Sequence, residues 1–193
     1  MFNRVINAGL VSAALAFGLA LSSSAQADLT DISRADATAL DIAAEKTLSQ
    51  FRADTKGADE VLANAKGVLV CPTIRKGGFG VGVEGGRCVL TSGASEHLYY
   101  GLTALKTGFI VGVASHSMIL VMNTDTALAK FTSGKREWEF GVDASVAVAK
   151  IGVGGDLDTT NLKKDIVSFI IGSKGLIADA TWEGSRFKKL DVE

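Results

Sequence analysis

The sequence predicts an α+β fold, in which N-terminal helices are followed by a curled antiparallel β-sheet that forms a barrel or sandwich. Residues 32–53 show helical periodicity, and the chain after Gly67 is rich in valine, isoleucine and glycine in short runs. No alternation of strands with helices follows, so a parallel sheet is not expected. Helices ahead of many short strands are typical of α+β proteins with small closed or packed sheets.

The first 27 residues are predicted to be a secretory signal peptide. Arg4 supplies a positive charge, an apolar uncharged run covers residues 5–21, and Ala25-Gln26-Ala27 has the small residues of a cleavage site. A membrane anchor is the alternative, because the run is near the shortest length that spans a bilayer. We expect cleavage after Ala27, a single domain over residues 28–193 and a periplasmic location.

Three helices are predicted. Residues 32–53 have apolar positions at helical spacing, and Asp31 or Ser33 is available to cap their start. A short second helix is expected at 58–65, after a break at Gly57. A third is expected at 124–131, capped by Thr124 or Asp125.

The strands are predicted to be short. A strand at 68–70 is expected to end at Pro72, which has no N–H to donate to a ladder. Residues 78–83 alternate glycine with apolar side chains, as in a strand, and Gly85-Gly86 is expected to form a turn. The same pattern recurs at 107–113. Further strands are expected at 88–90, 98–102, 117–123, 139–149, 166–171 and 175–182.

The only two cysteines, Cys71 and Cys88, bracket the glycine-rich stretch. Paired cysteines are common in exported proteins, and closing this loop would contribute about 3 kcal/mol in a chain-entropy treatment. Two buried free thiols are the alternative. We expect the disulfide.

Motifs for cofactor or enzyme chemistry are weak. Residues 80–85, GVGVEG, have the spacing of a dinucleotide-binding loop, but a strand-like segment follows them where a helix is required. His116 lies between two serines, which a strand would turn to the opposite face. Asp156 and Asp158 lack the other ligands of a calcium loop. We expect no catalytic activity, no cofactor and no metal.

Charge excludes one class of partner and favours another. The net charge of the whole chain is −1, so nucleic acid is not expected as a partner. Two segments place tryptophan beside basic residues, a combination suited to a membrane–water interface. Ordinary turns with an inward-packed tryptophan are the alternative. The candidate lipid-binding residues are Lys135, Arg136, Trp138, Trp182, Arg186, Lys188 and Lys189.

Four blocks in order resemble the SYLF domain: residues 57–86, then TGFIVGVASHSMILVM, then FGVDASVAVA, then GLIADATWEGSRF. The resemblance runs from about Ala35 to Leu190. It implies a non-enzymatic lipid-binding domain, since eukaryotic relatives bind phosphoinositides and some associate with actin, while bacterial relatives are exported envelope proteins. The chain departs from the pattern at Cys71 and Cys88, and where relatives often read glycine-proline it has Ala149-Lys150.

The expected function is therefore that of a periplasmic phospholipid-binding module associated with a membrane surface. The alternative is a structural or protein-interaction component of the cell envelope. Actin is not expected as a partner of an exported protein.

Overall fold

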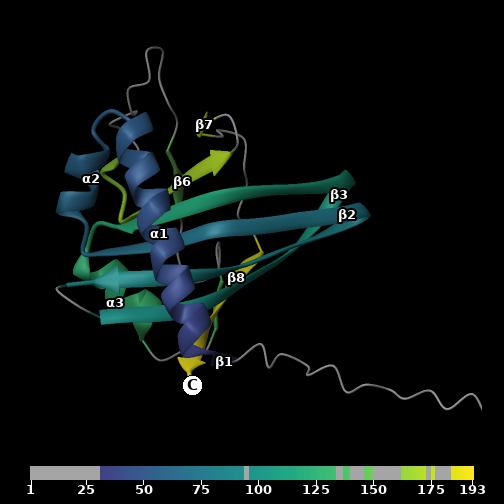
Figure 1. The fold of residues 1–193 in the computed structure, drawn as a ribbon. Helices are drawn as coiled ribbons and strands as arrows, with labels where there is room; N and C mark the ends of the chain where they lie inside the picture. Colours follow the sequence, from purple (N-terminus) through teal and green to yellow (C-terminus); the bar gives the residue numbers. More distant parts are fainter. Residues whose placement is uncertain are drawn as a thin grey trace, which may run out of the picture.

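The computed structural model describes residues 31–93, 96–133, 137–139, 146–149, 162–172, 175–176 and 184–193. The predicted signal peptide lies outside these residues. The elements follow one another as β1 (Asp31–Ile32), α1 (Arg34–Asp54), α2 (Ala58–Asn64), β2 (Gly67–Ser92), β3 (Glu96–Met122), α3 (Asp125–Thr132), β4 (Glu137–Glu139), β5 (Ala147–Val148), β6 (Ile166–Gly172), β7 (Gly175–Leu176) and β8 (Ser185–Val192) (Figure 1).

The strands form one large mixed sheet, and this confirms the α+β class but not the closed form. The path β1-β8-β3-β6-β5 has two ends over the described residues, so the expected barrel or sandwich is wrong. Two of the pairings, β1 with β8 and β5 with β6, are parallel. The helices are also not all N-terminal, since α3 follows β3.

Two very long strands replace the series of short ones. β2 and β3 pair with each other along nearly their whole length, and we call this antiparallel pair the ribbon. The predicted end at Pro72 is wrong, because a bulge between Cys71 and Ile74 accommodates the proline and the ladder continues. The missing N–H costs little there, and the Ser117 Oγ donates a 2.7 Å hydrogen bond to the Pro72 carbonyl.

The reversal predicted at Gly85-Gly86 is also misplaced. Those residues pair with Thr103 and Leu102 inside the ladder, and the chain reverses only after Gly93, whose φ is +62°. Glycine is needed at Gly86 for another reason. A Cβ there would lie 2.6 Å from the Thr73 carbonyl oxygen, because the first half of β2 crosses close to the second.

One face of the sheet is covered by α1 and α2. The Ser33 hydroxyl accepts from the Asp36 N–H at 3.1 Å, which fixes the start of α1, two residues later than predicted. Phe51 from α1 lies with its ring centroid 4.8 Å from that of Phe169 on β6. Burial of such an aromatic side chain contributes ~1.5–3 kcal/mol. Val70, Val89, Ile119 and Val121 extend the same core.

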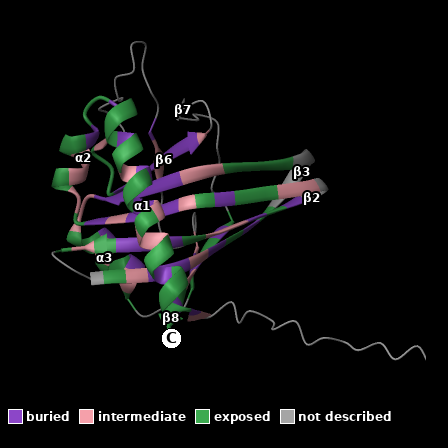
Figure 2. Ribbon diagram, in the orientation of Figure 1, coloured by how far each residue is buried: buried purple, intermediate pink, exposed green. Residues whose placement is uncertain are grey.

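The opposite face curls around α3. Strand residues alternate between the two faces, so Leu69, Cys71, Cys88 and Leu90 point into this second core. The N-terminus of α3 is capped by Thr124, as predicted, through a 3.2 Å bond from Ala127 N–H. Figure 2 shows buried residues concentrated in the body of the protein. Many exposed residues lie along the part of the ribbon that projects from this body.

Candidate functional site

A groove of about 630 Å³ lies on the α1 face of the sheet, between α1 and the strands. Leu40 and Ala43 line it from the helix, and Leu190 lines it from β8. Three cationic side chains line it as well, Arg75 and Arg87 from β2 and Lys188 from β8. The groove therefore combines an apolar lining with positive charge.

The glycines of β2 and β3 help to form this hollow. Gly85, Gly86 and Gly101 all line the groove, so its floor is partly bare backbone. At Gly101 a Cβ would meet the Leu190 side chain at 3.6 Å, an ordinary contact, whereas Gly86 has no room for one. The glycine-rich strand thus keeps space open beneath α1 and brings the two halves of β2 together.

The cations of the groove differ in how they are held. The Arg87 Nη1 lies 3.1 Å from Asp36 Oδ2, which ties β2 to the first turn of α1. Within the described part of the chain, neither Arg75 nor Lys188 has an ion-pair partner. Asp31 and Glu137 also line the groove, so its charge is balanced only in part.

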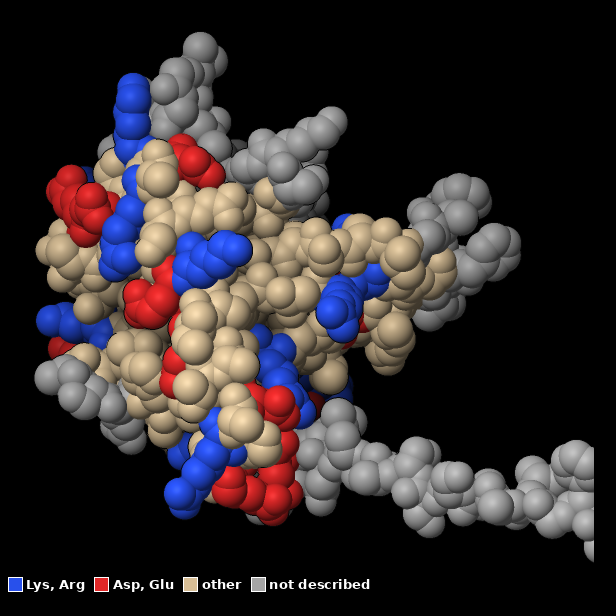
Figure 3. Space-filling view, in the orientation of Figure 1, with Lys and Arg blue, Asp and Glu red and all other residues tan. Residues whose placement is uncertain are grey.

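A second hollow, of about 620 Å³, adjoins the groove and shares Arg75 and Gly85 with it. It extends along the ribbon and is lined by Lys76, Val83 and Val113. Figure 3 shows Lys and Arg side chains on the part of the ribbon that projects from the body, and also at the base of this projection. Together the two hollows form a continuous basic and apolar surface.

The structure separates the residues predicted to bind lipid. Trp138 is only 1% exposed and lies 5.0 Å, between ring centroids, from Phe131 and 6.0 Å from Phe187. It is a core residue, as the alternative interpretation held, and does not belong to a surface. Lys135, Arg136 and Trp182 lie outside the described residues.

The three predicted cations of β8 do lie on the described part of the protein. Lys188 lines the groove, whereas Lys189 is exposed and is not among the residues that line it. Arg186 is engaged with two acids of β4, with its Nε 3.3 Å from Glu139 Oε2 and its Nη1 3.7 Å from Glu137 Oε1. The arrangement therefore supports Lys188 more strongly than Arg186 as a residue that meets a ligand.

Sequence reasoning missed Arg75 and Arg87. A signal was present, because Arg75-Lys76 and Arg87 flank the two ends of the glycine-rich stretch. The candidate residues were basic residues next to tryptophan, so basic residues next to glycines were left out. No prediction placed the first helix at a binding site, although α1 forms one wall of the groove.

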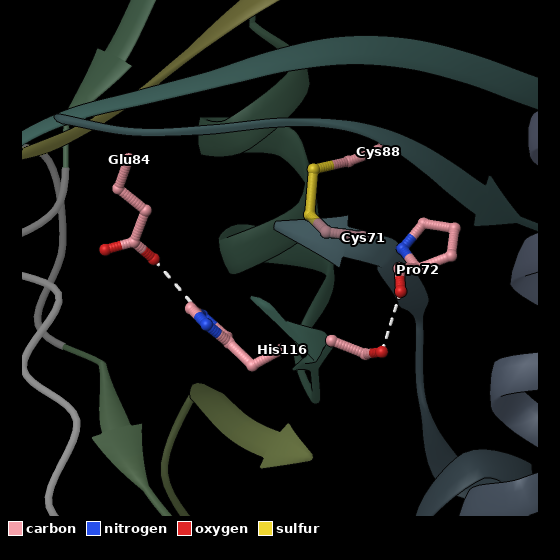
Figure 4. Close-up of a disulfide and its surroundings, with 6 residues drawn as sticks. Cys71, Pro72, Glu84, Cys88 and His116 are labelled. Atoms are coloured by element: carbon pink, nitrogen blue, oxygen red, sulfur yellow. Dashed lines mark hydrogen bonds and ion pairs between the residues drawn. A yellow bond between two sulfur atoms is a disulfide. The ribbon is translucent and has the colours of Figure 1, made fainter. Parts of the chain in front are cut away.

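The disulfide is confirmed. Cys71 and Cys88 are bonded and fully buried, and the bond joins the two halves of β2. Figure 4 shows it near a buried pair from the same two halves of the ribbon, Glu84 and His116. The Glu84 Oε1 lies 3.1 Å from His116 Nε2, and both side chains are less than a tenth exposed. Covalent and polar contacts thus hold the fold of the ribbon.

Two kinds of feature are absent from the described residues. No group of three or more His, Cys, Asp or Glu side chains there is placed to hold a metal ion. No helix there is long and apolar enough to cross a membrane.

Comparison with known proteins identifies part of the chain. Residues 103–191 match the family model described as "Ysc84: Las17-binding protein actin regulator", which is the SYLF family. No curated protein matches the chain. The matched region contains most of β3 and the groove residues Glu137, Lys188 and Leu190, while Arg75 and Arg87 precede it. Residues 103–191 therefore match a domain of the SYLF family, in agreement with the resemblance seen in the sequence.

Proposed function

We propose that the protein is a periplasmic module that binds anionic phospholipid at a membrane surface and has no catalytic activity. The observation that carries the proposal is the pair of cations without acid partners in the described chain, Arg75 and Lys188, in a partly apolar groove. A phosphate group meets these cations favourably, because ion pairs at a partly dehydrated site are screened less than pairs in open solvent.

The apolar part of the groove suits the rest of a phospholipid. Leu40, Pro72 and Leu190 supply apolar contact beside the cations. Burying the upper part of an acyl chain against them would contribute on the order of 0.8 kcal/mol for each methylene. The groove therefore offers both of the contacts that distinguish a phospholipid from a free phosphate.

Co-sedimentation with vesicles tests the proposal. We expect residues 28–193 to bind vesicles of phosphatidylcholine mixed with phosphatidylglycerol and to bind pure phosphatidylcholine weakly. Arg75→Gln and Lys188→Gln should each weaken binding about fivefold, since each basic residue near an anionic surface contributes ~1 kcal/mol. Lys130→Gln is the matched control, because Lys130 is an exposed cation on α3, which covers the other face.

Three outcomes would contradict the proposal. The first is an absence of binding to either vesicle at low salt. The second is an equal loss of binding in the Lys130→Gln control. The third, for the non-catalytic part, is a change in the mass of phospholipid recovered after incubation. The location is tested separately, by cell fractionation and mass spectrometry. The proposal expects the protein in the periplasmic fraction, with the intact mass of a chain that starts at residue 28.

A protein-binding role in the envelope is the second candidate, and the edge of β2 favours it. Among the described strands β2 pairs with β3 alone, so its outer edge is open along the ribbon. Open edges accept an added strand from a partner. Capture of one stoichiometric protein from an envelope extract, with no phospholipid by mass spectrometry, would favour this role over the first.

A further inference from the structure

The far end of the ribbon extends past the rest of the sheet. β3 pairs with β8 over residues 99–104 and with β6 over 117–122, so between these ranges its one described neighbour is β2. We call residues 77–83 of β2 and 105–113 of β3 the ribbon tip. Figure 1 shows both strands reaching away from the helices at this end.

The ladder loosens at the ribbon tip. Phe79 pairs with Val111 and Val81 with Thr107, so three residues of β3 oppose a single residue of β2. Such an insertion bends the pair and increases its twist. The ribbon folds back at this point, which makes the tip a narrow two-stranded projection.

Apolar side chains at the ribbon tip are unusually exposed. Val113 is 91% exposed, Leu105 72% and Val83 62%. Val83 and Leu105 are direct register partners, and Val113 faces Gly77 on the neighbouring strand. In sequence, the ribbon tip carries one charged residue, Lys106, and is otherwise uncharged. A two-stranded hairpin is marginal in water by itself, so this surface costs stability unless something covers it.

The charges beside the ribbon tip indicate what covers it. Arg75 and Lys76 are exposed and line the same hollow as Val83 and Val113. The acid in that hollow, Glu84, is buried and lies against His116. A second copy of this chain would bring like charges together, which opposes self-association. An anionic bilayer places phosphates at the cations and hydrocarbon at the apolar side chains.

We infer that the ribbon tip is a wedge that inserts into the outer part of an anionic phospholipid bilayer. This inference rests on the proposed function and adds a second contact to it. The groove holds a head group, while Leu105, Val83 and Val113 enter the region just below the head groups.

The backbone limits the depth of insertion. The outer edges of β2 and β3 at the ribbon tip carry N–H and C=O groups that no described strand pairs. Unpaired backbone groups are costly in hydrocarbon, so the tip stays near the interface, where water still reaches them. The wedge is therefore shallow.

Depth-dependent quenching tests the wedge directly. Val113→Trp places a fluorophore at the tip, and Thr91→Trp places one at an exposed position near the hairpin turn. The vesicles contain phosphatidylglycerol and phosphatidylcholine with bromine either high on the acyl chains or near their ends. We expect the added fluorescence of Val113→Trp to be quenched, most strongly by bromine high on the chain. That of Thr91→Trp should not change.

Binding provides the second measurement. Leu105→Asp should weaken vesicle binding about tenfold, which corresponds to about 1.4 kcal/mol. Ile42→Asp is the matched control, because Ile42 is 68% exposed on α1 and lies outside both hollows. The control should bind within about twofold of the parent, since no hydrocarbon contact is removed. Circular dichroism confirms that each variant is folded.

The two proposals fail in different ways. Vesicle binding that depends on Arg75 and Lys188, without quenching at position 113 and without loss in Leu105→Asp, overturns the wedge and leaves the head-group site. Absence of all vesicle binding overturns both. A dimer in sedimentation that Leu105→Asp dissociates, again without quenching, assigns the tip to a second copy and overturns the wedge.

Discussion

Removing the Cys71–Cys88 disulfide is expected to lower the free energy of unfolding by about 3 kcal/mol. The bond joins residues that are 17 apart in sequence, and the chain-entropy relation for a loop of that length gives this value at 25 °C. Both sulfur atoms are buried in a packed core, so the native structure keeps its shape when the bond opens and the effect falls on the unfolded chain.

Urea denaturation measures this loss in three samples: the oxidised protein, the reduced protein and Cys71→Ala with Cys88→Ala. With a urea slope of ~2 kcal/mol/M, the midpoint should fall by about 1.5 M on reduction. The slope itself should rise, because the unlinked unfolded chain exposes more surface. The alanine variant should be less stable than the reduced protein, since it also loses the packing of two sulfur atoms.

Reduction that lowers the unfolding free energy by less than about 1 kcal/mol would refute the reasoning, because it would mean that the bond does not restrict the unfolded chain as the loop length requires. Equal stability of the reduced protein and the alanine variant would show, separately, that the buried sulfurs contribute little to packing.

Three further predictions follow from single residues. Gly86→Ala should cost ~1–3 kcal/mol in urea unfolding, because the new Cβ would meet the Thr73 carbonyl oxygen at 2.6 Å; unchanged stability would contradict the crossing. Phe131→Ala should cost ~3–5 kcal/mol in the same assay, since the ring is the centre of the aromatic cluster of the second core. Burial, aided by a hydrogen bond from its hydroxyl to Asp41, raises the pKa of Tyr99 from 10.0 to about 12. The stability that this neutral hydroxyl supplies is complete below pH 10 and is lost as the pH rises through 12. The melting temperature of Tyr99→Phe should therefore fall less steeply between pH 10 and 12 than that of the parent protein.

The helices were predictable because their signals are local. The periodicity of residues 32–53 matches α1 to within two residues at its start and one at its end, and the hydroxyl of Thr124 caps α3 as expected. The strand character of the repeated glycine patterns at 78–83 and 107–113 was also predicted correctly, since these segments lie in β2 and β3.

The strand lengths were not predictable from local signals. Proline and paired glycines usually interrupt a strand, but here a bulge accommodates Pro72 and a close crossing requires Gly86. Both features depend on the other half of the ribbon, which lies far away in sequence. The strand β8 was missed for a related reason. Its charged residues mask the strand pattern, although Phe187 and Leu190 lie among them and are buried.

The candidate site was predicted only in part. Lys188 was found from its neighbours in sequence, whereas its companions Arg75 and Arg87 come from β2 and meet it only through the sheet. Trp138 was misassigned because a tryptophan beside basic residues suits an interface as well as a core. Its position beneath α3 depends on the curl of the sheet, which no local pattern encodes.

The hairpin connection of β2 and β3 also has a consequence for the order of folding. The first ladder pair, Ser92 with Glu96, is nearly adjacent in sequence, and the last, Gly67 with Met122, is the most distant. Each pair that forms brings the next two residues together, so the loop that remains to be closed is always short. We expect the ladder pairs to form first next to the turn at Gly93 and last at Gly67 and Met122. Pulse-labelled hydrogen exchange should therefore find amides near Ser92 protected before those near Gly67. Strand residues that are far apart in sequence are thereby paired through steps that each close only a short loop.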